Sequence, residues 1–232
     1  MKDTLSKKQI LSHMVKTDIN YQLHIYDSIS STNELAKKMI YMGDAVAGSI
    51  IIANMQTAGR GRIGRSFFSP IGGIYISFIF SGNQILHEEQ FFLFAPCVAV
   101  CLTLEKLFDI NPKIKWPNDI IMDNKKVCGI LTETQMSKNG DNIIIGIGVN
   151  YSTNLKSFPN DIEAIVGSLK SHVKTLSKNK FVTELINMLN EVRTTSEYKK
   201  RMRLLKKTFM QYLVMKKSRQ KHLIFIVMVD SR

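Results

Sequence analysis

Glycine and proline are absent from the last part of the chain. All 13 glycines and all 5 prolines of the 232 residues lie at or before Gly167, and residues 168–232 contain neither. A compact domain of that size normally uses glycine in its tight turns. The sequence therefore predicts a turn-punctuated body followed by a segment of a different kind.

Cysteines and long apolar runs are also scarce. Three cysteines (Cys97, Cys101 and Cys128) do not make a disulfide framework in a chain of this length and fit a reducing compartment. No apolar run approaches the ~20 residues of a membrane span, and the polar N-terminus has no apolar signal core behind it. We therefore expect a cytoplasmic protein without a membrane span.

Acidic residues are scarce only in the C-terminal part. The net charge is +13, with 16 basic and 15 acidic residues up to Gly167, but 16 basic and 4 acidic residues from Ser168 onward. A strong positive charge often indicates a nucleic-acid or anionic membrane partner. Here it belongs to the glycine-free segment, while the body is almost neutral.

The body alternates apolar runs with polar turns. Periodicity predicts strands at 21–26, 49–54, 73–81, 114–116, 120–122, 126–134 and 142–149, and helices at 32–42, 88–108 and 181–192. Ser31 followed by Glu34 is a capping-box pattern, and Gly43 suits the end of that helix. The mixed order predicts an α/β fold with a mixed central sheet and helices mainly on one face.

Residues 59–65 (Gly-Arg-Gly-Arg-Ile-Gly-Arg), called the arginine loop below, form the first candidate functional segment. Alternating glycines let backbone N–H groups point at an anion, and arginines offer forked donors to phosphate or carboxylate oxygens. The alternatives are a solvated loop or a nucleic-acid patch. Against these, the segment follows a buried strand and is not repeated. It is not a Walker loop, because no Gly-Lys-Ser/Thr follows.

Two further segments stand at predicted strand ends. In residues 115–119 (Lys-Trp-Pro-Asn-Asp) the lysine ends a strand and the proline starts an extended turn. By itself this pattern also fits an exposed lysine, a core tryptophan and a polar turn. In residues 146–150 (Gly-Ile-Gly-Val-Asn) two strand glycines permit the close approach of a ligand or of another backbone, or mark a β-bulge.

Together these segments resemble the catalytic domain of the biotin protein ligases. The matching pieces are residues 31–33 (Ser-Thr-Asn), Gln56 with the arginine loop, residues 115–119, residues 126–133 (Lys-Val-Cys-Gly-Ile-Leu-Thr-Glu) and residues 146–150. They follow the family's order across residues 21–170.

The resemblance implies a class II synthetase-like catalytic domain that joins biotin to ATP as biotinyl-5′-AMP and then to a lysine of a biotin carboxyl carrier protein. ATP and Mg²⁺ are the implied co-reactants. An anion must approach a polyanion in the first step, so fixed positive charge is needed. The arginine loop is expected to be mobile and to close over the acyl-adenylate, which needs shelter from water.

The resemblance also implies roles for individual residues. Lys115, Arg60 and Arg62 are the catalytic candidates, and Asp119 is the candidate metal ligand. The biotin contacts carry over to Ser31, Thr32, Asn33, Gln56, Arg60, Gly61, Arg62, Lys115 and Gly129. The ATP or adenylate contacts carry over to Arg62, Arg65, Trp116, Asn118, Asp119, Lys126 and Asn150.

Both ends of the chain depart from the family pattern. Only about 20 residues precede the first catalytic strand, which leaves no room for a DNA-binding helix-turn-helix and indicates a monofunctional ligase without specific DNA binding. We expect a catalytic domain at 1–195 and a basic tail at 196–232, with a short β-prone run at 223–229, where the family's SH3-like barrel is missing or degenerate. A truncated or divergent end is favoured over a basic amphipathic helix that binds membrane or nucleic acid.

Three questions stay open at this point. A lipoate or octanoyl ligase of the same fold is one alternative function, although the arginine loop together with residues 115–119 favours biotin. An inactive ligase-like protein that binds nucleic acid through its tail is the other. Members of the family dimerise through sheet edges, and the sequence leaves a homodimer open.

Overall fold

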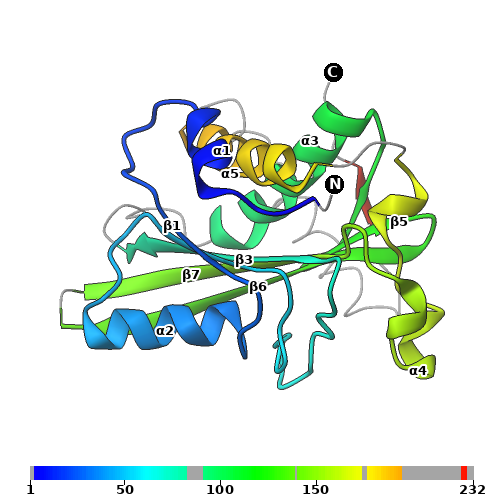
Figure 1. The fold of residues 1–232 in the computed structure, drawn as a ribbon, viewed down its shortest axis with the longest axis horizontal. Coiled ribbons are helices and arrows are strands. Elements are labelled where there is room, and N and C mark those ends of the chain that lie inside the picture. The colour runs from blue at the N-terminus through cyan, green and yellow to red at the C-terminus, as the bar shows by residue number, and fades with distance from the viewer. Residues whose placement is uncertain (1–2, 83–90, 139, 174–176, 195–225, 229–232) are drawn as a thin grey trace, which may run out of the picture.

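A mixed eight-stranded sheet forms the centre of the computed structural model, which describes residues 3–82, 91–138, 140–173, 177–194 and 226–228 (Figure 1). The strand order within these residues is β1-β2-β3-β7-β6-β5-β4-β8. β1 and β2 are parallel, and the other neighbours are antiparallel. The strands are β1 (Gln22–Tyr26), β2 (Ser49–Ala53), β3 (Ile74–Ser81), β4 (Lys113–Lys115), β5 (Asp119–Met122), β6 (Lys125–Ser137), β7 (Gly140–Val149) and β8 (Ile226–Met228).

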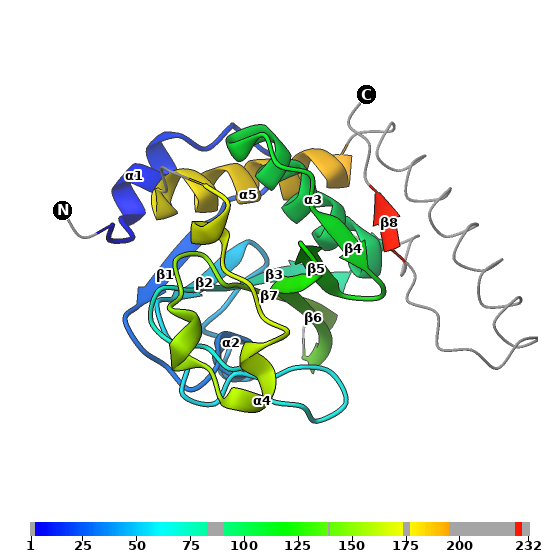
Figure 2. The ribbon, with the colours of Figure 1, turned by 90° about the vertical axis from the view of Figure 1, so that its right-hand side faces the viewer.

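Helices cover the two faces of the sheet unequally. α1 (Lys7–Ser12), α3 (Phe91–Phe108) and α5 (Lys178–Thr194) lie on one face, and α2 (Thr32–Met42) lies on the other (Figures 1 and 2). α2 is the crossover between the two parallel strands. The remaining helical segments are short: η2 (Leu155–Ser157), α4 (Asn160–Glu163) and η3 (Leu169–Ser171). The predicted mixed sheet with helices mainly on one face is confirmed.

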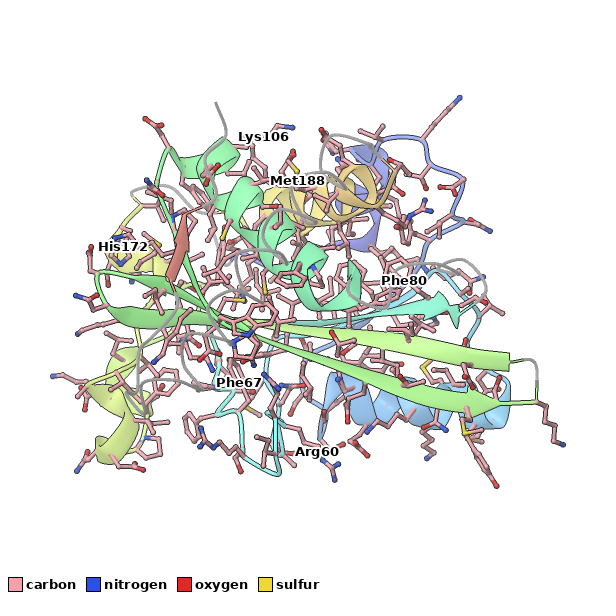
Figure 3. All side chains as sticks on the ribbon, turned by 180° about the vertical axis from the view of Figure 1, so that it is seen from behind. Arg60, Phe67, Phe80, Lys106, His172 and Met188 are labelled. Atoms are coloured by element: carbon pink, nitrogen blue, oxygen red, sulfur yellow. The ribbon has the colours of Figure 1, made fainter. Side chains whose placement is uncertain are left out.

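Strand alternation divides the core between the two faces. Ile145, Ile147 and Val149 of β7 belong to the large cluster under α3 and α5, whereas Ile144 belongs to a small cluster under α2. Figure 3 shows the large cluster as a dense layer of side chains that includes Phe80 and Met188. The large cluster has apolar helices above it, so that face is closed. The α2 face is covered only in part and leaves room for a site.

The ends of α2 follow the predicted capping pattern. The Ser31 hydroxyl accepts a hydrogen bond from the Glu34 backbone N–H at 3.4 Å, and Gly43 ends the helix with a φ of 80°. Only glycine adopts that left-handed conformation without a steric cost. The capping box therefore fixes where Thr32 and Asn33 enter the helix.

The N-terminal segment is attached to α5 by two asparagine side chains. Asn179 accepts from the Ser6 N–H at 2.7 Å and donates to the Thr4 carbonyl at 2.9 Å. Asn187 accepts from the Val15 N–H at 3.0 Å and donates through its Nδ2 to the His13 carbonyl. The sequence analysis predicted no element before residue 21, because one turn of helix is too short to show a periodicity.

β8 comes from the expected tail and joins the sheet. It pairs with β4 so that Ile226 stands opposite Lys115 (Figure 2). The other residues of the expected tail, 196–225 and 229–232, and the expected helix start at Glu88 lie outside the described residues. The proposed domain boundary at 195/196 therefore stays a prediction. In the described part of the chain, no helix combines the length and the hydropathy needed to cross a bilayer.

Candidate active site

A cavity of about 370 Å³ opens on the α2 face of the sheet, within the usual size range of small-molecule sites. Five segments line it: the start of α2, the β2–β3 connection with the start of β3, the β4–β5 turn, and the glycine-containing parts of β6 and of β7. The lining residues are Ser31, Thr32, Asn33, Gln56, Arg60, Gly61, Arg62, Ile63, Arg65, Ser66, Phe67, Tyr75, Lys115, Trp116, Pro117, Asn118, Asp119, Lys126, Gly129, Ile130, Leu131, Gly146, Ile147 and Gly148.

One end of the cavity is polar and rigid. Gln56 Oε1 accepts from the Thr32 backbone N–H at 2.8 Å and from the Thr32 hydroxyl at 3.1 Å. Its amide nitrogen donates to the Ser69 hydroxyl at 2.8 Å, which in turn donates to the Phe67 carbonyl. These contacts fix which amide atom is which, and they hold the Gln56 side chain against the start of α2.

The arginine loop is folded as a small hairpin over the cavity. The Gly61 N–H donates to the Arg65 carbonyl at 2.7 Å, and Arg60 and Ser66 form an antiparallel bridge. Ile63 and Gly64 occupy the turn with φ values of 54° and 69°. A β-branched residue is strained in that conformation. Ile63 is also 91% exposed, so the tip of the hairpin has few contacts to hold it.

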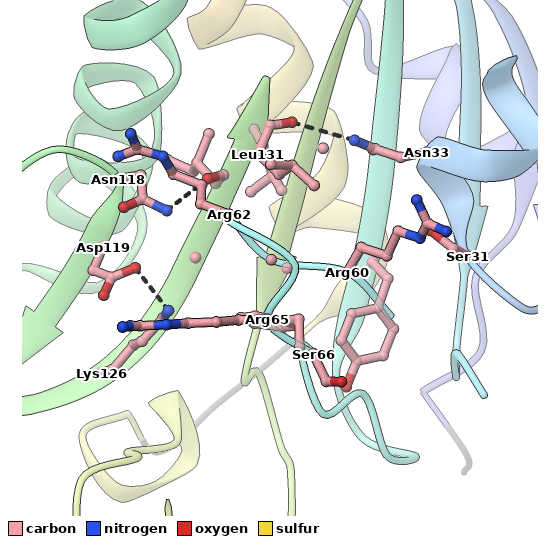
Figure 4. A pocket seen from close by; sticks show the side chains of 18 of the residues that line it. Ser31, Asn33, Arg60, Arg62, Arg65, Ser66, Asn118, Asp119, Lys126 and Leu131 are labelled. Atoms are coloured by element: carbon pink, nitrogen blue, oxygen red, sulfur yellow. Dashed lines mark hydrogen bonds and ion pairs between the residues drawn. The ribbon is translucent and has the colours of Figure 1, made fainter. Parts of the chain in front are cut away.

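The opposite end of the cavity is strongly cationic. Lys115 ends β4 and Lys126 is the second residue of β6. Figure 4 shows Arg65 beside Lys126 and Arg62 beside Asn118. Asp119 is the only carboxylate among the lining residues, and it forms an ion pair with Lys126 at 2.7 Å. An excess of positive charge in a half-enclosed cavity favours a polyanionic ligand.

The β4–β5 turn is packed in from behind. The Trp116 ring stacks on Phe94 of α3, with ring centroids 4.5 Å apart. Asn118 Nδ2 donates to the Ile130 carbonyl at 2.9 Å, and the Ile130 N–H donates back to the Asn118 carbonyl. The Trp116–Pro117 peptide is cis. This part of the cavity wall is therefore set by the core and by β6.

Glycines in β6 and β7 leave room for two side chains of the protein itself. A Cβ atom on Gly148 would lie 2.4 Å from the Phe67 ring, and one on Gly129 would lie 2.7 Å from it. A Cβ atom on Gly146 would lie 2.2 Å from Asn33 Oδ1. The strand glycines thus admit Phe67 and Asn33, and β7 pairs regularly through Gly146 and Gly148, without a β-bulge.

All but one of the predicted site residues line this cavity. The exception is Asn150, which is buried and donates from Nδ2 to the Lys126 carbonyl at 3.3 Å. Asn150 thereby holds the backbone of a lining residue in place. The sequence analysis missed Phe67 and Tyr75, because aromatic residues beside apolar strands give no signal that separates a cavity wall from a core.

The three cysteines are buried and form no disulfide with one another. Burial raises the pKa of Cys97 to about 12 and raises the pKa values of Cys101 and Cys128 well above their ordinary range. A thiolate nucleophile is therefore disfavoured at all three positions. The cysteines fill space in the large core cluster between α3 and the sheet.

Comparison with known proteins decides the family. The model of the Biotin/lipoate A/B protein ligase family matches residues 25–150, more than half of the chain and the part that carries most of the cavity. The chain belongs to this family. The conclusion agrees with the fold and with the order of the motifs.

Curated proteins similar to this chain are named as ligases. The bifunctional ligase/repressor BirA of Bacillus spizizenii is 38% identical over 158 residues, 67% of this chain and 48% of that protein. The biotin–[acetyl-CoA-carboxylase] ligase of Paracoccus denitrificans is 34% identical over 133 residues, 53% of this chain and 51% of that protein. This chain therefore spans about half the length of the curated relatives it matches.

Among solved structures, the biotin protein ligase of Aquifex aeolicus, determined in complex with biotin and ATP, is similar over 78% of this chain and 76% of that chain. The TM-score is 0.64 and the sequence identity is 29%.

Proposed function

We propose that this chain is an ATP-dependent ligase that activates biotin as biotinyl-5′-AMP and transfers the biotinyl group to a lysine of a biotin carboxyl carrier protein. The observation that carries the proposal is the polarity of one cavity. Its rigid polar end, around Thr32 and Gln56, faces an end with uncompensated cations. Biotin combines a ureido ring with a carboxylate, and ATP adds phosphates. The ureido ring would meet the polar end of the cavity, and the carboxylate and phosphates would meet the cationic end.

The polar end suits a ureido group. A ureido ring loses water on entering a cavity and needs replacement hydrogen bonds. The hydroxyl groups of Ser31 and Thr32 and the amide of Gln56 offer donors and acceptors there, and their positions are already fixed. An apolar dithiolane ring, as in lipoate, could not use the donor and acceptor capacity that these groups have beyond their contacts within the protein. This argument favours biotin over lipoate.

The cationic end suits the first chemical step. The biotin carboxylate attacks the α-phosphorus of ATP, the bond to the bridging oxygen breaks, and pyrophosphate leaves. Lys115, Arg62 and Arg65 would stabilise the charge that gathers on the phosphate oxygens. In the second step a carrier lysine amine attacks the mixed anhydride and AMP leaves. Neither step needs an enzyme nucleophile, in keeping with the buried thiols.

A magnesium ion would enter with ATP. The described residues contain no group of three or more acidic, histidine or cysteine side chains that could hold a metal by themselves. Mg²⁺ does not need one, because it keeps water ligands and binds phosphates with one or two carboxylates. Asp119 is the residue that would hold it, provided that Lys126 releases one carboxylate oxygen. When bound, the ion would neutralise phosphate charge.

Biotin-dependent exchange of labelled pyrophosphate into ATP tests the adenylation step, and transfer of labelled biotin to a carboxyl carrier domain tests the second step. We expect both, and we expect lipoate to replace biotin poorly. Exchange with lipoate and not with biotin would assign the chain to the other branch of its family. Salt-sensitive RNA binding without any exchange would support the inactive nucleic-acid-binding alternative.

A further inference from the structure

Four charged side chains of alternating sign connect the arginine loop to the sheet. Arg60 Nη1 lies 3.0 Å from Glu34 Oε1, and the same oxygen lies 3.0 Å from Lys37 Nζ. Lys37 Nζ lies 2.7 Å from Glu133 Oε1. Arg60 belongs to the arginine loop, Glu34 and Lys37 to α2, and Glu133 to β6. We call these four residues the ion-pair chain.

The inner end of the ion-pair chain is anchored in buried structure. The second oxygen of Glu133 accepts from Asn33 Nδ2 at 2.8 Å, and Asn33 Oδ1 accepts from the Ser77 hydroxyl at 2.6 Å. Asn33 is 4% exposed and Ser77 is fully buried. Gly146 leaves the space that Asn33 occupies. Both partners of Glu133, Lys37 and Asn33, therefore belong to α2, and Ser77 of β3 fixes Asn33 in turn.

Exposure falls along the chain from its outer to its inner end. The side chain of Arg60 is 57% exposed, that of Glu34 36%, and those of Lys37 and Glu133 23% each. Burial disfavours the charged form of Lys37, but its hydrogen bonds to Glu133 and Glu34 outweigh that effect and raise its pKa. An isolated ion pair at the surface stabilises a side-chain position only weakly. A network with half-buried inner members gives Arg60 a fixed partner.

The arginines of the loop differ in their partners. Within the described residues, Arg60 has a carboxylate partner, whereas Arg62 and Arg65 form no ion pair with a described carboxylate. Figure 4 shows Arg60 on the side of Ser31, while Arg62 lies beside Asn118 and Arg65 beside Lys126. The positive charge of Arg60 is already compensated, so Arg62 and Arg65 keep the charge that a phosphate would meet.

We propose that the ion-pair chain fastens the Arg60 end of the arginine loop to α2 and β6 before any ligand arrives, with Glu34 and Glu133 acting as positioning residues for Arg60, so that the expected closing movement is confined to the rest of the loop. An exposed arginine loses much rotamer freedom when it is immobilised. Because the ion-pair chain forms during folding, Arg60 is already immobilised and loses little further rotamer freedom when a ligand binds. The consequence for biotin rests on the proposed function, whereas the fastening of the loop does not.

Limited proteolysis tests the fastening without any ligand. Trypsin cleaves after arginine, and the arginine loop offers three such sites in the folded full-length protein. We expect Glu34→Gln and Glu133→Gln to accelerate cleavage within residues 60–65 at least several-fold, with the sites identified by mass spectrometry. Asp18→Asn is the matched control, because it removes an ion pair with Arg193 far from the loop. Cleavage rates equal to wild type in both variants would overturn the proposal.

Kinetics separate the positioning of Arg60 from general destabilisation. In the biotin-dependent exchange reaction we expect each variant to raise the KM for biotin several-fold while kcat changes less than twofold. The double variant should be no worse than Glu34→Gln alone, since Glu133 reaches Arg60 only through Lys37 and Glu34. Equal losses in kcat and in melting temperature, with KM unchanged, would overturn the positioning role. If the wild type shows no exchange, the proposed function fails and the trypsin experiment alone decides the fastening.

Discussion

The ring of Phe67 lies over Gly148, so closely that a Cβ atom at that glycine would be 2.4 Å from Cε1 of the ring. Gly129 stands directly opposite Gly148 in the β6–β7 ladder and faces the same ring at 2.7 Å. The pair of glycines forms a flat floor, and the Phe67 ring rests on it. Lys126 Nζ lies 5.3 Å from the ring centroid. A cation of the cavity thus lies over the aromatic ring that rests on the two glycines.

Substitution of Gly148 by alanine should displace the Phe67 ring. Overpacking of this kind costs about 1–3 kcal/mol of the free energy of unfolding. Urea denaturation measures that loss, and the KM for biotin should rise because the ring lines the cavity. The double variant with Phe67→Ala is the control: removing the ring should make Gly148→Ala nearly neutral. Additive losses in the double-mutant cycle would contradict the contact.

Trp116 should report ligand binding by fluorescence. It is the only tryptophan of the chain, it lines the cavity, and it stacks on Phe94. Bound adenosine changes the polarity around an indole, so emission should shift on titration with ATP and biotin. Lipoate at the same concentrations is the comparison. An unchanged spectrum at saturation, with binding verified by calorimetry, would place the ligands elsewhere.

Replacing Lys115 by alanine should block adenylate formation. Removing one charged donor from a developing phosphate charge costs about 10²–10³-fold in rate. Biotin-dependent pyrophosphate release measures the loss. Lys113→Ala is the matched control, because Lys113 is an exposed lysine of the same short strand that does not line the cavity. Normal pyrophosphate release from Lys115→Ala would count decisively against the assigned role.

Replacing Arg62 by alanine should let the adenylate escape. Arg62 lies on the loop that covers the cavity and has no described carboxylate partner, so its charge is free to hold the ligand phosphate. We expect adenylation to remain measurable while biotinyl-5′-AMP leaves the protein at least several-fold faster, as followed by rapid filtration. Lys38→Ala, which removes an exposed cation of α2, should retain the intermediate. Retention by Arg62→Ala as tight as wild type would refute the role.

Lys178 should make stability depend on pH. It is 7% exposed, its ammonium donates to Asn54 Oδ1 at 3.1 Å, and burial lowers its pKa. Between that lowered pKa and the ordinary value near 10.5, the unfolded chain binds more protons than the folded chain. The contribution of Lys178 to the free energy of unfolding therefore rises with pH across that window.

Comparison with Lys178→Met isolates the effect of this one group. The free energy of unfolding of the wild type minus that of the variant should increase from about pH 7 to about pH 10. Lys180→Met, at an exposed position of the same helix, controls for placing a methionine there. A difference that stays constant across the range would show that burial does not lower the pKa of Lys178.

Most of the sheet could be predicted from the sequence, because its strands are apolar and bounded by turns. The two-residue turn at Asp123 and Asn124, with φ values of 45° and 61°, follows the predicted hairpin. The short helix α1 could not be predicted, since one turn carries no periodicity and its stability comes from α5. Its only local signal is Ser6, whose hydroxyl caps the helix.

The site was predictable as a set of segments but not as a set of contacts. The polar and cationic residues could be picked out because their types suit an anionic ligand. Sequence spacing does not reveal that Glu133 reaches Lys37, or that Asn33 is held by Ser77, because these contacts join distant strands and a helix. The same limit applies to Asn150, which supports Lys126 from outside the cavity.

The two asparagines of α5 set a boundary for shortening the chain. Asn179 and Asn187 together satisfy four backbone groups of the first 15 residues, and Ile10 between those contacts is fully buried. A version that begins at the first strand would leave an apolar strip on α5 open to water and two amides without partners. The opening residues are thus an integral part of the folding unit, so an expression design or an N-terminal fusion should keep them.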